Sequence, residues 1–151
     1  MFKEPKIKLV GRLNAVLTKP DGSQEKFERK NLIVDTGIDF LCDAAGKPSS
    51  RPGVVSHIAI GEGVTAADAS DTALETELTR KAATYAHTAG ASTFTMVSTF
   101  NPGEGTGDVS EAGVLNAGAS GILLNRVVFA AIPKEAGDTL EITFTFTLTP
   151  A

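Results

Sequence analysis

One cysteine and two histidines, Cys42, His57 and His87, are the residues of this chain best suited to covalent chemistry. A cysteine beside a histidine is a common nucleophile, because the imidazole takes the thiol proton. Cys42, however, falls on the apolar side of a predicted helix, where a buried and inert cysteine is common. His57 falls within a predicted strand, and three such residues are too few for structural zinc. We therefore expect no catalytic residue and no metal site here.

Carboxylates gather around one predicted loop, at Glu62, Asp68, Asp71 and Glu75. Calcium needs several oxygen ligands at defined spacing, and the spacing of an EF-hand loop is missing. A solvated acidic loop, in which Asp71 caps the following helix, is the simpler interpretation.

Two pairs of opposite charge are candidate structural ion pairs. Glu77 and Arg80 stand three residues apart in a predicted helix, and Glu111 and Arg126 lie in neighbouring predicted strands. An exposed pair contributes only ~0–1 kcal/mol to stability. A partly buried pair would instead fix the register of the strands.

Two glycine-rich stretches, at residues 61–63 and 103–107, resemble phosphate-binding loops only superficially. Such a loop must lead directly into the N-terminus of a helix, where free N–H groups meet the anion. An acidic stretch separates the first from the next predicted helix, and the second leads into a strand. We interpret both as turns and expect no cofactor.

Composition bounds the class of protein. The chain has 151 residues, a net charge of −4 and a single cysteine, and it contains no tryptophan. These totals indicate one domain made in a reducing cytoplasm, without an intrachain disulfide. An acidic balance argues against nucleic-acid binding, although basic residues gather near the start of the chain. The sequence shows no secretory h-region and no apolar run of about 20 residues, so we expect no membrane partner.

Strict alternation of apolar and polar residues dominates the end of the chain. Leu140, Ile142, Phe144, Phe146 and Leu148 alternate with threonine or glutamate over residues 139–149. Such a period of two predicts a half-buried antiparallel strand with one apolar face.

Shorter stretches of the same kind predict a mainly β fold. A hairpin is expected from residues 6–18 and 24–34, joined by a Pro-Asp-Gly turn. Further strands are predicted at residues 54–60, 82–87, 92–100, 109–115 and 122–130, and short helices at 35–45 and 73–81. The expected fold is a single all-β domain over residues 1–151, an antiparallel β-sandwich, jelly-roll-like, with two short helices.

A pattern over residues 31–149 resembles small structural proteins of tailed bacteriophages. It comprises Asn-Leu-Ile-Val-Asp-Thr-Gly at 31–37, Ile-Gly-Glu-Gly at 60–63, Asp-Thr-Ala-Leu at 71–74, Glu77, Arg80, Glu-Ala-Gly at 111–113, Arg126, Phe129 and Lys134. One branch of this class comprises capsid cement or decoration proteins, which bind the outside of the head. The other comprises the N-terminal collar domains of tail-fibre proteins, which share the Gly-x-Gly, Leu, Glu, Arg, Glu-x-Gly order.

The resemblance implies a virion structural protein without catalytic activity, made in the host cytoplasm. The leading hypothesis is a capsid cement protein that binds the major capsid protein, as a homo-oligomer. Fibre collar domains continue into a long shaft, whereas this sequence stops at residue 151, which favours the cement branch. A tail or baseplate connector, or a fibre-attachment protein, is the alternative. A carbohydrate-binding or hydrolytic β-sandwich is the remaining one, weakened by the lack of tryptophan.

An extended N-terminal arm, residues 1–6, is the expected means of attachment. Phe2, Lys3, Pro5, Lys6 and Lys8 combine basic charge with an apolar tip, which suits a segment laid across an acidic or strand-edge surface. A frayed terminus followed by an internal strand is the competing interpretation.

Overall fold

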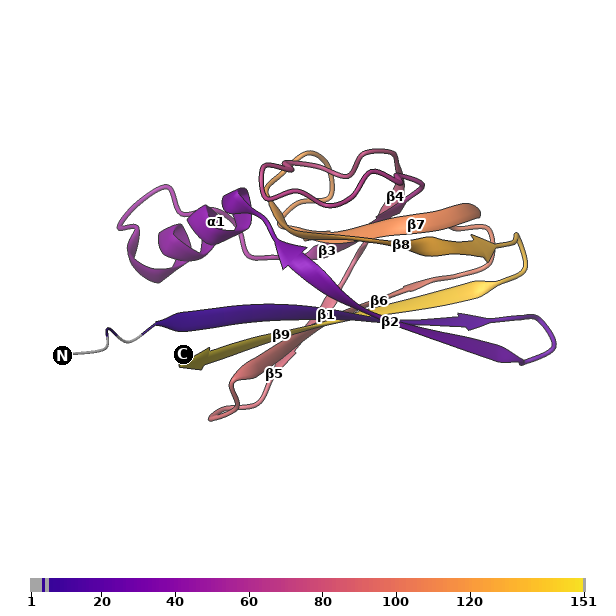
Figure 1. Cartoon of the computed structure of the whole chain (residues 1–151), viewed down its shortest axis with the longest axis horizontal. Coiled ribbons are helices and arrows are strands. Elements are labelled where there is room, and N and C mark those ends of the chain that lie inside the picture. Colours follow the sequence, from indigo (N-terminus) through magenta and orange to yellow (C-terminus); the bar gives the residue numbers. More distant parts are fainter. Residues whose placement is uncertain (1–3, 5, 151) are drawn as a thin grey trace.

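Nine strands and one helix make up the fold. The computed structural model describes residue 4 and residues 6–150 (Figure 1). The elements in chain order are β1 (Ile7–Thr18), β2 (Gln24–Ile33), α1 (Asp35–Gly46), β3 (His57–Gly61), β4 (Glu77–Ala82), β5 (Thr84–His87), β6 (Thr93–Phe100), β7 (Gly107–Leu115), β8 (Leu123–Lys134) and β9 (Thr139–Pro150).

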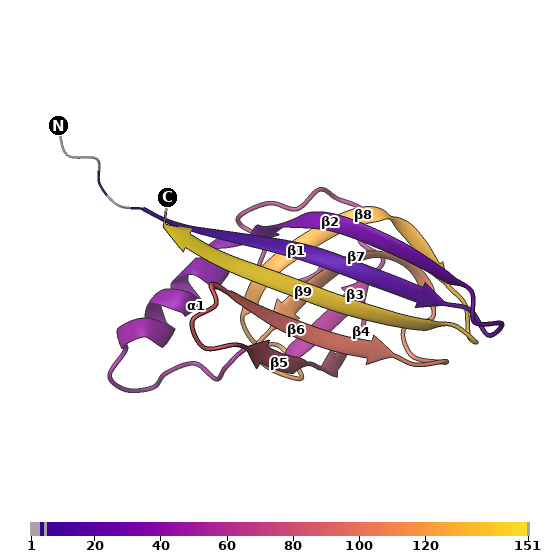
Figure 2. The ribbon, with the colours of Figure 1, turned by 90° about the horizontal axis from the view of Figure 1, so that it is seen from below.

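All pairings are antiparallel, and the strands form one continuous sheet in the order β4-β3-β7-β8-β2-β1-β9-β6-β5. The sheet folds over itself into two layers (Figures 1 and 2), with β3, β4, β7 and β8 facing β1, β9, β6 and β5. β2 runs with β1 along most of its length and joins β8 only through Leu32 and Ile33. The result is a sandwich that is nearly closed into a barrel.

A polar contact joins the edge strand β4 to β6 in the facing layer. Ser98 of β6 donates its hydroxyl to the carbonyl of Ala82 in β4 at 2.8 Å, and its side chain is buried. The N–H of Ala83, between β4 and β5, donates to the carbonyl of Ser56 at 2.8 Å and so continues the β3–β4 ladder by one residue. The Ser98 hydroxyl satisfies a carbonyl of the edge strand β4, and this bond joins the two layers where the ladder is interrupted.

β9 supplies much of the core, as its alternation predicts. Leu140, Ile142, Phe144 and Phe146 are fully buried, whereas Leu148 at the end of the strand is 37% exposed. β9 lies between β1 and β6 and pairs with both along its length. Its apolar face belongs to one core cluster with Ile60 and Val114 of the facing layer, which covers it from solvent. Phe146 stacks on Phe94 of β6 with ring centroids 4.9 Å apart.

The predicted first helix exists, but its cap and its buried face differ from expectation. Val34 precedes the helix and no side chain caps it; the Thr36 hydroxyl instead donates to the carbonyl of Leu123 at 2.8 Å. Gly37 lies so close to β8 that a Cβ there would be 2.1 Å from the carbonyl oxygen of Leu124. This close approach turns Gly37 and Phe40 inward and leaves Cys42 exposed.

The predicted second helix, over residues 73–81, is wrong. Residues 71–76 form a loop, and residues 77–82 form β4, which pairs with β3. The spacing of Leu74 and Leu78 fits a helix, but hydrogen bonds to β3 and to the residue after it hold this segment in an extended conformation. The carbonyl of Thr76, for example, accepts the N–H of Glu62 at 2.9 Å. The narrower jelly-roll description is not confirmed, since β1–β2, β3–β4, β5–β6 and β7–β8 each pair directly with the next strand of the chain.

Candidate functional site: a buried carboxylate hub and two surface grooves

Glu111 is the centre of a buried network of charges. Its side chain on β7 is fully buried, and Arg126 on the neighbouring strand β8 donates its Nε to Oε2 at 2.9 Å. Arg126 also donates Nη1 to Asp71 at 2.9 Å, so one guanidinium joins β7 to the acidic loop. Burial alone would lower the pKa of Arg126, but the hydrogen bonds that its guanidinium donates to Asp71 and Glu111, together with the charges of these carboxylates, outweigh burial, and the pKa is raised.

The same carboxylate holds the loop between β3 and β4. It accepts the backbone N–H groups of Gly63 at 3.0 Å, Glu75 at 2.9 Å and Thr76 at 2.7 Å. Charge-assisted bonds of this kind are roughly twice as strong as neutral ones. Glu111 therefore fixes two ends of one loop against β7 and β8.

Glycine is required where this loop meets the carboxylate. A Cβ on Gly63 would lie 2.5 Å from Oε1 of Glu111, and one on Gly61 would lie 2.3 Å from the carbonyl oxygen of Thr76. Neither position accepts a side chain without moving the network. The Gly-x-Gly and Glu-x-Gly parts of the sequence pattern are thus packed against each other.

Glu77 and Arg80 form an ion pair, with Arg80 Nη2 and Glu77 Oε1 2.7 Å apart, but they do so on β4 and not on a helix. Residues three apart in a regular strand point to opposite faces. A bulge between Thr79 and Glu77 opposite β3 inserts one residue and returns both side chains to the same side. Arg80 also donates Nη1 to the carbonyls of Ala117 and Ser120, at 2.9 and 2.8 Å.

The remaining acidic residues hold the backbone of the loop. Glu75 accepts the N–H groups of Val64 and Thr65, and hydrogen bonds from Thr65 lower its pKa. Asp68 accepts both the hydroxyl and the N–H of Ser70, which lowers its pKa as well. Asp71, expected to be a helix cap, instead pairs with the buried guanidinium. Among the described residues, no cluster of three or more potential ligands is placed to hold a metal ion.

The cysteine and the histidines occupy separate elements. Cys42 lies exposed on α1, so its predicted burial is wrong. The Nδ1 of His57, at the start of β3, lies 2.8 Å from the hydroxyl of Ser56, and Nδ1 of His87, at the end of β5, lies 2.8 Å from the carbonyl oxygen of Thr93. In the part of the chain that the structure describes, no hydrogen bond joins the cysteine to either histidine.

Most of the predicted N-terminal arm falls outside the described residues, namely Phe2, Lys3 and Pro5. Lys6 is exposed and precedes β1, whereas Lys8 belongs to β1 and pairs with Thr149 of β9. Residue 8 therefore belongs to the folded sheet. Both ends of the described chain lie at the end of the sandwich that carries α1 (Figure 2).

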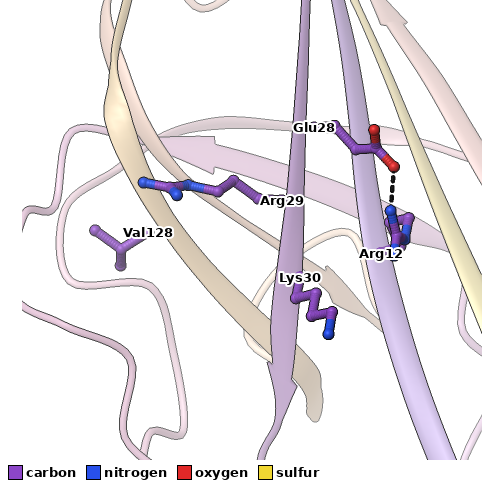
Figure 3. A pocket seen from close by; sticks show the side chains of 5 residues that line it. All are labelled: Arg12, Glu28, Arg29, Lys30 and Val128. Atoms are coloured by element: carbon purple, nitrogen blue, oxygen red, sulfur yellow. Dashed lines mark hydrogen bonds and ion pairs between the residues drawn. The ribbon is translucent and has the colours of Figure 1, made fainter.

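Sequence reasoning missed a basic groove between β2 and β8, with a volume of about 540 Å³. Figure 3 shows it: Arg29 reaches from β2 toward Val128 of β8, and Arg12 pairs with Glu28 at the rim beside Lys30. Arg29 lies opposite the buried Leu13 in the β1–β2 ladder, so its side chain points to the inner face of the sheet. It is nevertheless exposed, because β2 and β8 are not paired at this position. The run of charges over residues 24–30 was the available signal.

An apolar groove of about 450 Å³ lies between α1 and the β5–β6 hairpin. Its rim is open to solvent, since Val54 is 77% exposed and Tyr85 56% exposed. The other residues that line it are Phe40, Leu41, Ala44, Val55, Phe94 and Leu124. Exposed apolar surface of this kind is typical of protein contacts.

Comparison of the chain with protein-family models, with curated proteins and with solved structures finds no match. The single helix of the described chain is too short and too polar to cross a membrane. The site itself therefore has to support any functional conclusion.

Proposed function

We propose that this protein is a structural component of a tailed-bacteriophage virion, and that it acts as a capsid cement protein bound to the outside of the head. The observation that supports a virion role, in the head or in the tail, is the convergence of the phage-like pattern on one buried network. Gly63, Leu74, Glu111 and Arg126 are far apart in sequence, yet they lie around one carboxylate or pack beside it. The pattern residues thus build one structural element of this fold, which supports a structural role for the protein.

Surface features support a role in binding proteins. The basic groove offers Arg29 and Lys30 on an otherwise acidic protein, and the apolar groove offers Tyr85 and Val54. A cement subunit must gain its binding energy from a lattice that is already assembled, and exposed apolar surface beside charged groups suits that task. The major capsid protein is the proposed partner.

The N-terminal arm is the proposed contact with the shell. It continues from the exposed Lys6 and from Ile7, whose side chain is 81% exposed. Because β2 pairs with β1 only from Gly11 onward, residues 7–10 also leave one edge of β1 open to a further strand. An arm beginning there can be laid along an acidic or strand-edge surface of the shell.

A place in the tail, as a baseplate connector or fibre-attachment protein, is the second candidate. The observation that favours it is the packing of the Gly-x-Gly segment on the Glu-x-Gly segment, because this pair of motifs resembles the collar domains of tail fibres. The same attachment experiment separates the two candidates.

Re-addition to particles that lack the protein tests the proposal. Purified protein is added to particles from a phage whose gene carries a stop codon, and its occupancy on isolated heads and tails is measured. We expect it to bind heads, and deletion of residues 1–6 should lower occupancy while leaving thermal unfolding unchanged. Lys47→Glu, an exposed change directly after α1, is the control and should bind normally. Binding to tails alone would favour the second candidate, and normal binding after the deletion would contradict the role of the arm.

A further inference from the structure

The outer edge of β2 has a self-complementary sequence of charges. Residues 24–30 read Gln-Glu-Lys-Phe-Glu-Arg-Lys, with Phe27 at the centre. If two such strands run antiparallel about a two-fold axis through Phe27, Glu25 stands opposite Arg29 of the second copy. Lys26 then stands opposite Glu28 of the second copy. Every directly opposed charged pair next to the axis is therefore of opposite sign, which is the favourable case for cross-strand neighbours.

This edge is open in the described structure. Over residues 24–31, β2 pairs with β1 on one side, and on the other side the ladder with β8 begins only at Leu32. Apart from Phe27, which is half-buried, the side chains of residues 24–30 are exposed. Phe27, at the centre of the edge, precedes by five residues the junction with β8 at Leu32.

The turn of the hairpin determines which backbone groups face outward. Lys19 donates its N–H to the carbonyl of Ser23, Gly22 donates to the carbonyl of Lys19, and Gly22 has φ of 87°. This is a three-residue loop closed by a glycine bulge. Hydrogen-bonded and non-hydrogen-bonded residue pairs alternate along an antiparallel ladder, and Lys19–Ser23 is a hydrogen-bonded pair. Every second residue of β2 from Ser23 onward, including Glu25 and Phe27, therefore directs its N–H and C=O groups to β1. The N–H and C=O groups of the even-numbered residues therefore point away from β1.

The symmetric register uses those outward groups. With Phe27 opposite its own copy, Lys26 faces Glu28 and Gln24 faces Lys30, all of which carry outward N–H and C=O groups. If the register shifted by one residue, backbone groups that point away from β1 would stand opposite groups that point toward it. If it shifted by two residues, Lys26 would stand opposite Lys26 of the second copy, or Glu28 opposite Glu28. The backbone and the charges thus select the same alignment.

We propose that β2 is a homodimerisation edge, on which a second copy of this chain pairs antiparallel about a two-fold axis at Phe27. The contact is isologous, because each copy offers the same strand. It extends the sheet across the axis and brings the two Phe27 side chains together. The proposal concerns self-association and does not rest on the virion role.

Charge reversal on the edge tests this pairing. Dimerisation of the full chain is followed by sedimentation velocity over a concentration series. We expect a dimer, and Lys26→Glu should weaken it about tenfold or more, since symmetry places Glu opposite Glu28 twice. The double variant Lys26→Glu with Glu28→Lys restores opposite signs and should restore the dimer. Lys8→Glu, an exposed change on β1, should have no effect.

A second variant tests the backbone part of the contact. The N–H of Lys26 points away from β1, so Lys26→Pro removes a donor that only the dimer uses and should abolish the dimer while circular dichroism stays native. A protein that remains monomeric throughout the series would overturn the proposal. So would a dimer that tolerates Lys26→Glu, because the proposed register requires Lys26 to face Glu28.

Discussion

Replacing Glu111 with glutamine should greatly destabilise this protein, although the change is nearly isosteric. The amide nitrogen must replace one carboxylate oxygen. In place of Oε1 it faces the N–H donors of Gly63 and Thr76, and in place of Oε2 it faces Glu75 and Arg126. Either way donors lose their acceptor in a site that no water reaches, because Glu111 is fully buried.

The expected cost follows from two estimates that overlap. A buried donor left without an acceptor costs about 1–3 kcal/mol, and removing one partner of a buried ion pair costs about 3–5 kcal/mol. Since Arg126 keeps its bond to Asp71, we expect a loss of about 3–5 kcal/mol for Glu111→Gln. For a domain of this size that corresponds to a fall of roughly 6–20 °C in the unfolding midpoint.

Urea unfolding followed by circular dichroism measures this loss. The matched control is Asp43→Asn on α1, the same chemical change in a pair with Lys47 whose side chains are 32% and 41% exposed. That pair should contribute at most about 1 kcal/mol. A loss below about 1 kcal/mol for Glu111→Gln, comparable with the control, would refute the view that the carboxylate organises the loop.

Three further changes test the packing and the charges. Phe144→Ala should cost about 3–5 kcal/mol in urea unfolding, since the side chain is fully buried, and a much smaller loss would mean that this face meets a partner instead. Gly63→Ala should destabilise by about 2 kcal/mol or more, because its Cβ would meet the buried carboxylate, whereas Gly46→Ala, with nothing within 4 Å, should not; equal effects in thermal unfolding would contradict the close contact. The hydrogen bond and charge of Lys19 hold the pKa of Asp138 below its ordinary 3.8, so this ion pair stabilises the fold fully above that pH and less as the pH falls through the lowered pKa. Asp138→Asn should therefore flatten the acid side of the stability–pH curve, and an unchanged curve would exclude the pair as a source of acid sensitivity.

Local periodicity predicted the strands well and the loop between β3 and β4 badly. The alternation over residues 139–149 has a single interpretation, and the structure confirms it. The spacing of Leu74 and Leu78 fits a helix as readily as a loop followed by a strand. What decides between them is Glu111, whose carboxylate takes the N–H groups of Glu75 and Thr76, and that contact is remote in sequence.

Exposure on the helix was likewise set by contacts that the sequence does not display. Apolar residues at 38, 41 and 42 suggested one face, but the close approach of Gly37 to Leu124 rotates the helix so that Cys42 faces solvent. The basic groove was missed because it requires the pairing order of the strands. Only the gap between β2 and β8 turns an inward-facing Arg29 into an exposed one.

Locating the protein on intact particles tests the central proposal most directly. A specific antibody is applied to whole phage particles, and the label is found by electron microscopy. Label distributed over the head is the result that a capsid cement protein predicts. Label confined to the tail, or particles that carry none of the protein, would contradict it.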